Sequence, residues 1–126
     1  CPGRAAFIGF LDEESGAVAR LVNEWKVALP LHPEFGTHPN VYYVPPLAPA
    51  PLNPDGSANE GGSRIPPEYL ESLFGPDVHK ALDTLKSEIG KKRAGEGSAL
   101  LDTLIVYEWK DVLGPYARDP AEIVWK

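Results

Sequence analysis

The feature that most restricts the fold of this chain is a short β-forming run, Asn40-Val41-Tyr42-Tyr43-Val44, enclosed by prolines. Valine and tyrosine favour extended backbone, whereas proline fixes φ and removes a backbone donor. The flanks are therefore excluded from helices and from the centre of a sheet. We expect one short strand that continues into an extended, polyproline-like arm. The flanking prolines are Pro30, Pro33, Pro39, Pro45, Pro46, Pro49, Pro51 and Pro54.

The predicted arm, residues 40–52, requires a neighbouring surface, because an extended chain makes few hydrogen bonds to itself. Val41 and Tyr43 would occupy one face of the strand and Tyr42 and Val44 the other. A strand with one face in solvent normally alternates polar and apolar residues, yet here both faces are apolar. We therefore predict that this segment is a docking arm. Its predicted partner contacts are Tyr42, Tyr43, Pro45 and Pro46.

Composition excludes several classes of function. The chain has 126 residues, enough for one small domain, and its apolar share of 43% argues against wholesale disorder. The net charge of -6 argues against nucleic acid and against attachment to an anionic membrane surface. No apolar run approaches the ~20 residues of a membrane-spanning helix. A single cysteine excludes an internal disulfide.

Apolar residues at helical spacing predict three helices. The first follows the acidic stretch 12–15 and ends before Pro30. The second begins near Pro67, which suits the first helical turn. The third begins with Asp77 as its N-cap and ends at Gly90 in the left-handed conformation. The run Lys91-Lys92-Arg93 then interacts favourably with the negative end of the helix dipole, and we interpret it as a solvated helix end.

Two further stretches have less distinct patterns. Residues 5–11 form an apolar run with glycine that fits a short strand. Residues 100–107 combine helical spacing with the β-forming Ile105-Val106-Tyr107, so helix and strand both stay open. In between, residues 53–63 are rich in turn-forming residues and predict a surface loop. Together these patterns predict an α+β chain with little sheet and an extended region between residues 30 and 66.

Cys1 is the strongest candidate for chemistry. A Cys-Pro dipeptide closes the ligand run of bacterial ferredoxins, but one cysteine cannot hold a cluster, and a thiol without function is the alternative. Because the chain opens on Cys1 and contains no methionine, we expect a processed product or a fragment of a longer protein.

A second candidate combines His32, Glu34 and His38, which could supply three ligands to zinc. The intervening prolines favour a series of turns, so the alternative is that these histidines cap backbone carbonyls in a loop. No phosphate-binding glycine loop, nucleophile elbow or HExxH motif is present in the sequence. The chain therefore shows no catalytic constellation of its own.

Two stretches carry a resemblance to a known family: residues 1–22, CPGRAAFIGFLDEESGAVARLV, and residues 32–47, HPEFGTHPNVYYVPPL. They resemble the iron–sulfur (β) subunits of molybdenum oxidoreductases of the DMSO reductase family. The first is similar to the end of the last cysteine group there, where a Cys-Pro ligand precedes a small-residue turn, a strand, an acidic corner and a helix, and the second is similar to the segment that follows. The pattern is most similar to the branch with ethylbenzene and dimethyl sulfide dehydrogenases and selenate, chlorate and perchlorate reductases, with nitrate reductases as near relatives.

The resemblance implies that the chain is the C-terminal part of such a subunit, with the other cysteine groups upstream. It implies three regions: the edge of a ferredoxin-like module with the docking arm in residues 1–52, a loop in residues 53–65, and a mainly helical C-terminal extension in residues 66–126. Cys1 would ligate an iron–sulfur cluster, of the 4Fe-4S or 3Fe-4S type, in the intact subunit. Arg4 would lie near that cluster.

The implied function is electron transfer in anaerobic respiration, without catalysis by this chain. The resemblance implies a catalytic α subunit with a molybdenum bis-pterin cofactor and a γ subunit with haem b as partners. The complex is expected to be periplasmic or membrane-associated, with the cytoplasmic side as an alternative. From the residues alone, a stand-alone interaction module that binds through its proline-rich arm remains the other hypothesis.

Overall fold

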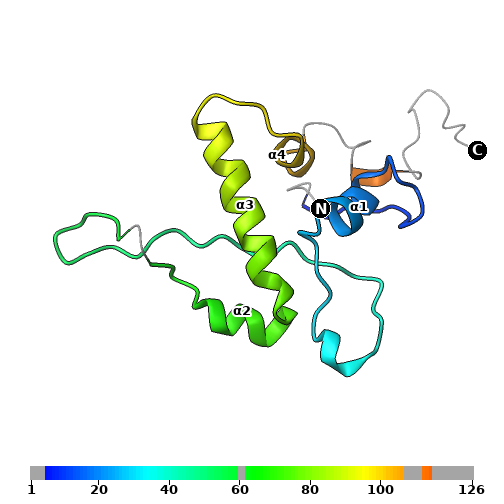
Figure 1. The fold of residues 1–126 in the computed structure, drawn as a ribbon, viewed down its shortest axis with the longest axis horizontal. Coiled ribbons are helices and arrows are strands. Elements are labelled where there is room, and N and C mark those ends of the chain that lie inside the picture. The colour runs from blue at the N-terminus through cyan, green and yellow to red at the C-terminus, as the bar shows by residue number, and fades with distance from the viewer. Residues whose placement is uncertain (1–4, 60–61, 107–111, 115–126) are drawn as a thin grey trace, which may run out of the picture.

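The computed structural model describes residues 5–59, 62–106 and 112–114, and its helices surround one long central helix (Figure 1). The helix α3 spans Asp77–Arg93, and α2, Pro67–Phe74, precedes it. The short helices α1, Ala17–Ala19, and α4, Ala99–Leu104, lie together on one side of α3. The end of the arm and the loop that follows it, residues 53–59, project on the opposite side. The predicted helices at 67–74 and from residue 77 onward are confirmed.

The first helix begins as α-helix and continues as the π-helix η1, Arg20–Glu24. Its last bond runs from the Trp25 N–H to the Arg20 carbonyl at 2.8 Å, one residue further than in an α-helix. The Arg20 guanidinium lies 4.2 Å from the centre of the Trp25 ring and pairs with Glu24 at 2.9 Å. Lys26 then has a φ of 54°, which ends the helix ahead of Pro30 as predicted.

Strand pairing is limited to two isolated bridges within the described residues. Leu29 and Tyr43 exchange two antiparallel hydrogen bonds of 2.8 Å each, and Leu52 pairs with Ala58. The strand expected at residues 40–44 is thus reduced to one bridge. The strand expected at residues 5–11 is also wrong, since these residues form no strand. The Ile8 N–H instead donates to the Val112 carbonyl at 2.7 Å.

Two apolar clusters form the core, and α3 contributes to both. The first cluster joins the start of α3 to α2 and to Leu29. The second joins Leu85 of α3 to Leu21 of η1 and Leu100 of α4. Because α3 packs on its neighbours at two points along its length, it is the central helix that connects the two clusters. The buried residues of the first cluster are Leu29, Leu70, Phe74, Val78, Ala81 and Leu82, and those of the second are Leu21, Val27, Ala28, Leu85 and Leu100.

The predicted ends of α3 need two corrections. Pro76, not Asp77, occupies the N-cap, and no side chain caps this end. Gly90 lies inside the helix, which continues to Arg93. The left-handed residue is Gly95, with a φ of 84°. Its N–H donates to Lys92 and that of Glu96 to Lys91, which is the Schellman arrangement. Gly90 was a misleading signal, because one glycine inside a well-packed helix costs only about 1 kcal/mol.

The ambiguous stretch from residue 100 begins as helix α4, and its start is fixed by a buried serine. The Ser98 hydroxyl oxygen accepts a hydrogen bond from the Leu101 N–H at 3.2 Å, as an N-cap does. The same hydroxyl donates to Glu88 on α3 at 2.5 Å. This contact ties the two helices together. The β-forming residues at the end of the stretch include Tyr107, which lies outside the described residues.

Replacement of Leu85 by alanine tests the contribution of α3 to the core. Leu85 is 4% exposed in the second cluster, so the truncation should lower the free energy of unfolding by about 2–5 kcal/mol. Lys86→Ala is the matched control on the exposed side of the same turn and should change it by about 0.5 kcal/mol at most. Urea denaturation of the subunit measures both. Equal effects of the two substitutions would contradict the packing described.

Candidate functional site

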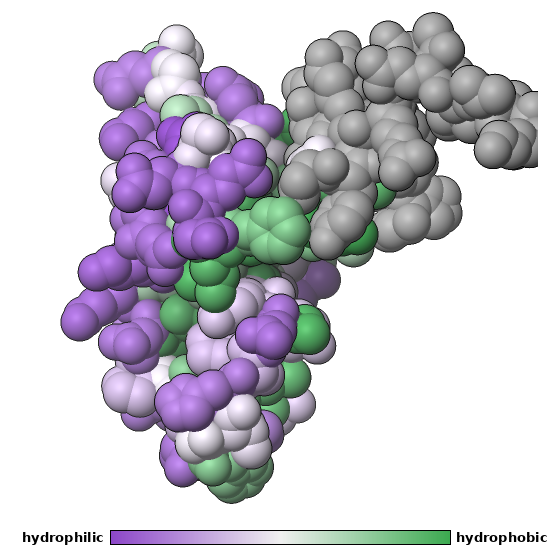
Figure 2. All heavy atoms as spheres, turned by 90° about the vertical axis from the view of Figure 1, so that its right-hand side faces the viewer, coloured by the Kyte–Doolittle hydropathy of each residue, from purple (hydrophilic) through white to green (hydrophobic). Residues whose placement is uncertain are grey.

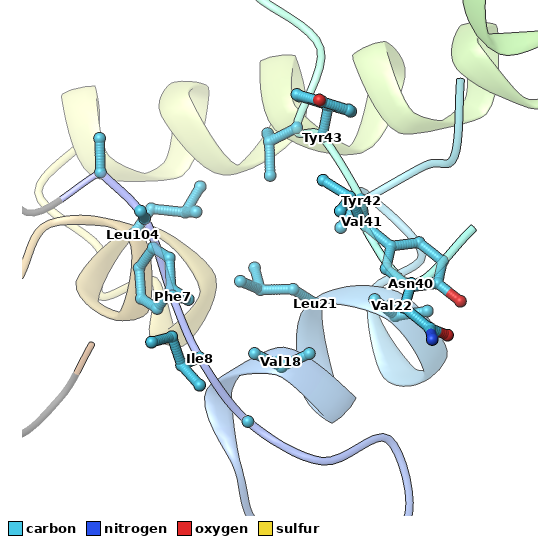
Figure 3. Close-up of a pocket in the computed structure, with 15 residues that line it drawn as sticks. Phe7, Ile8, Val18, Leu21, Val22, Asn40, Val41, Tyr42, Tyr43 and Leu104 are labelled. Carbon is cyan, nitrogen blue, oxygen red and sulfur yellow. The ribbon is translucent and has the colours of Figure 1, made fainter. Parts of the chain in front are cut away.

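An apolar groove of about 700 Å³ lies between the N-terminal segment, α1, η1, α4 and the arm (Figure 3). Phe7, Ile8 and Leu104 stand on one side of it, and Val18 and Leu21 stand opposite. No charged side chain lines the groove within the described residues. The lining residues are Ala5, Ala6, Phe7, Ile8, Gly9, Val18, Leu21, Val22, Ala28, Asn40, Val41, Tyr42, Tyr43, Val44 and Leu104.

The groove exists because the N-terminal segment runs close to α1 without a strand partner. A Cβ atom on Gly9 would approach the Val18 Cγ2 atom to 3.1 Å, so glycine permits this close contact. The Ile8 N–H bond to Val112 holds the same segment at a second point. The side chain of Ile8 remains 50% exposed. The segment is thus held in place but leaves apolar surface open to solvent.

The arm forms another part of the groove, and its two faces differ. Tyr42 and Val44 pack against the second apolar cluster of the chain. Val41 and Tyr43 are 57% and 46% exposed, although the Tyr43 ring lies 6.4 Å from that of Phe74. The chain therefore covers one face of this segment and leaves the other open.

The four predicted partner contacts fall into different environments. Pro45 is fully buried within the chain, Tyr42 is partly buried, and Tyr43 and Pro46 are exposed.

Figure 2 shows one face of the molecule, on which hydrophobic side chains gather in a central band and hydrophilic ones cover one margin. An uncovered apolar surface of this kind is typical of a contact region.

The predicted cluster residues, Cys1 and Arg4, lie outside the described residues. Across residues 5–59, 62–106 and 112–114, no three His, Cys, Asp or Glu side chains come together as metal ligands. In the same ranges, each helix is too short or too polar to cross a membrane.

In the second sequence candidate, at His32, Glu34 and His38, two of the side chains share a hydrogen bond, and the three do not form a metal site. The His32 Nδ1 atom lies 2.8 Å from the Glu34 Oε1 atom, and the imidazole stacks on Phe35 at 4.9 Å. His38 does not join them in a metal-ligand group. The hydrogen bond from His32 lowers the pKa of Glu34. The imidazole therefore binds a carboxylate and does not cap a backbone carbonyl.

Comparison with known proteins identifies relatives, although no protein-family model matches the chain. It is 55% identical over 107 residues to dimethylsulfide dehydrogenase subunit beta of Rhodovulum sulfidophilum, a match that covers 85% of this chain and 33% of that protein. It is 50% identical over 116 residues to selenate reductase subunit beta of Thauera selenatis, covering 90% and 35%. The chain is a homologue of these oxidoreductase β subunits.

A respiratory relative extends this set. The respiratory nitrate reductase subunit beta of Haloferax mediterranei is 53% identical over 104 residues, which cover 82% of this chain and 29% of that protein. The chain thus spans about a third of the length of the β subunits that it matches. The resemblance drawn from residues 1–22 and 32–47 to the β subunits of the DMSO reductase family is confirmed.

The groove could not be found from the sequence. Its lining comes from residues 5–9 and 40–44, from Val18, Leu21 and Val22, and from Ala28 and Leu104. Each of these stretches is an ordinary apolar run, and only the packing around α3 brings them together. The close approach at Gly9 is the one local signal, because a glycine in an apolar run indicates that another part of the chain passes nearby.

The hydrogen bond between His32 and Glu34 gives a pH prediction. The pKa of Glu34 is lowered below 4.5 by its hydrogen bond with His32, so the contact stabilises the fold above the unfolded pKa of the carboxyl group. That stabilisation is lost as the pH falls through the lowered, folded-state pKa. His32→Ala should move the pKa of Glu34 back up toward 4.5. Nuclear magnetic resonance titration of the carboxyl group measures the change.

Glu88 serves as the internal control for this titration. Its pKa is lowered mainly by a hydrogen bond from Lys91 and also by one from Ser98, neither of which involves His32. The pKa of Glu88 should therefore stay unchanged in the His32→Ala variant. A Glu34 carboxyl group that titrates at 4.5 or above before the substitution would refute the contact.

Proposed function

We propose that the chain is part of an electron-transfer subunit that relays electrons through iron–sulfur clusters between a molybdenum catalytic subunit and a haem b subunit. The observation that carries this proposal is 50–55% identity to the β subunits of dehydrogenases and reductases over at least 82% of the chain. Substrate chemistry would then belong to the catalytic subunit. The complex would be periplasmic or membrane-associated.

Within this proposal, Cys1 ligates one cluster of the intact subunit, and residues 1–52 form the edge of a ferredoxin-like module. Cluster irons bind thiolates, and hydrogen bonds to the sulfurs together with solvent exposure set the reduction potential. Arg4 would place a positive charge near that cluster. The described part of the chain has no metal-ligand group of its own, so the remaining ligands would come from the rest of the subunit.

The arm would contact the catalytic subunit through the face that carries Val41 and Tyr43. The hydrogen bonds between Leu29 and Tyr43 and the burial of Pro45 hold the arm against the core. A segment that is already ordered loses little conformational entropy on binding. Tyrosine is also well suited to interfaces, because it combines a large apolar ring with a polar end. The exposed face is therefore suited to docking.

Replacement of Cys1 by serine in the intact subunit tests the cluster assignment. Serine is a harder ligand and binds iron less well than a thiolate, so one cluster should be lost or converted while the others stay. Electron paramagnetic resonance spectra and iron content report the change. Unchanged spectra together with unchanged iron content would exclude Cys1 as a ligand.

Tyr43→Ala tests the docking face. Loss of a buried tyrosine anchor at an interface costs on the order of 2 kcal/mol or more, so binding to the catalytic subunit should weaken about 30-fold. Titration of the β subunit against the catalytic subunit measures the dissociation constant. The cluster spectra should not change. Tyr69→Ala on α2 is the matched control, because Tyr69 is 57% exposed and is not part of the arm.

Tyr42→Ala should behave differently from Tyr43→Ala. Tyr42 packs against the second cluster of its own chain, so its truncation should lower the stability of the subunit more than its affinity for the catalytic subunit. If all three tyrosine variants assemble normally but Tyr42→Ala and Tyr43→Ala slow electron transfer, the docking face is wrong and the tyrosines belong to the redox path.

A further inference from the structure

We propose that the apolar groove is filled by an extended segment from the remaining, cluster-binding part of the same β subunit. This inference rests on the proposed function, since it requires that the chain belongs to a larger subunit. It adds a second contact surface, formed by residues 5–9, η1, α4 and the arm, which serves the subunit's own assembly. Val41 and Tyr43 also line the groove, and the part of their surface that the segment leaves exposed remains the contact for the catalytic subunit.

The chemistry of the groove determines what can occupy it. Its lining is aliphatic and aromatic apart from the Asn40 amide and the tyrosine hydroxyl groups, and no charged side chain among the described residues reaches it. A charged or strongly polar ligand would lose its hydration there without a compensating partner. An apolar side chain gains by leaving water. The occupant is therefore a segment with apolar side chains.

The backbone of both walls favours an extended occupant. Among the described residues, the backbone N–H and C=O groups of Ala6, Phe7 and Tyr42 make no hydrogen bond. Unpaired groups along extended backbone are a template for pairing with another strand. An added strand would supply main-chain hydrogen bonds while its side chains enter the apolar space, as in other cases of strand addition.

The length of the relatives indicates where this segment comes from. The matched β subunits are about three times as long as the part that this chain covers. Residues 5–9, which line one side of the groove, continue directly from the Cys1 segment in sequence. If Cys1 ligates a cluster, the rest of the cluster-binding part lies within a few residues of this side. The sequence thus places that part of the subunit next to this side of the groove.

Carbene footprinting of the intact β subunit tests this inference without any substitution. Photolysis of a diazirine labels exposed C–H bonds, and labelling of the urea-unfolded subunit supplies the intrinsic rate for each residue. Ile8 is 50% exposed when this chain is alone and the groove is empty. If the groove is filled, Ile8 should become as buried as Leu21, at 4%, and its labelling should fall about tenfold. Tyr69, at 57% exposure on α2, should stay labelled and is the matched reference.

Three results would overturn the inference. Protection of Ile8 that appears only after the catalytic subunit is added would show that the other polypeptide fills the groove. Protection that grows with the concentration of the β subunit would show that a second copy does so. Full labelling of Ile8 in every form would show that the groove stays open. Iron analysis of the same sample separates this outcome from the proposed function, because a subunit without iron contradicts electron transfer whatever the labelling of Ile8.

Discussion

Two hydrogen bonds between Leu29 and Tyr43 attach the arm to the core, and the rest of the structure depends on this attachment. Each is 2.8 Å long, and they form the bridge between the helical part and the arm. Leu29 belongs to the first apolar cluster, and the neighbours of Tyr43 in sequence, Tyr42 and Val44, pack on the second. The bridge therefore joins both clusters. It also explains how a proline-rich segment with little structure of its own is held against α3.

The same arrangement explains why apolar surface remains open on this chain. The arm covers the core with one face, and the opposite face carries Val41 and Tyr43 at about half exposure. The groove beside residues 5–9, which the same two side chains also line, continues this uncovered apolar area. Open surfaces of this kind are unfavourable for an isolated protein but are needed where a subunit joins others. The homology to β subunits of multi-subunit oxidoreductases agrees with this view.

The helices could be predicted from the sequence because their signals are local. The apolar stripes at 67–74 and from residue 77 onward, with Pro67 near the start of one helix, are short-range patterns. The strand at residues 40–44 had a strong local propensity, but only Tyr43 finds a partner, since pairing depends on what lies alongside. The end of α3 was misplaced at Gly90 because two glycines compete, and only the hydrogen bonds of Gly95 and Glu96 decide between them. The family was recognisable from residues 1–22 and 32–47, whereas the groove depends on the packing of segments that lie far apart in the sequence.

The central claim, that this chain belongs to an iron–sulfur electron-transfer subunit, is tested most directly by chemical analysis of the intact subunit. Iron and acid-labile sulfide should be present together in the purified protein, and reduction should produce the electron paramagnetic resonance signals of iron–sulfur clusters. Electron exchange with the proposed haem b subunit should then change the intensity of those signals. A correctly folded subunit that contains neither iron nor sulfide would contradict the account.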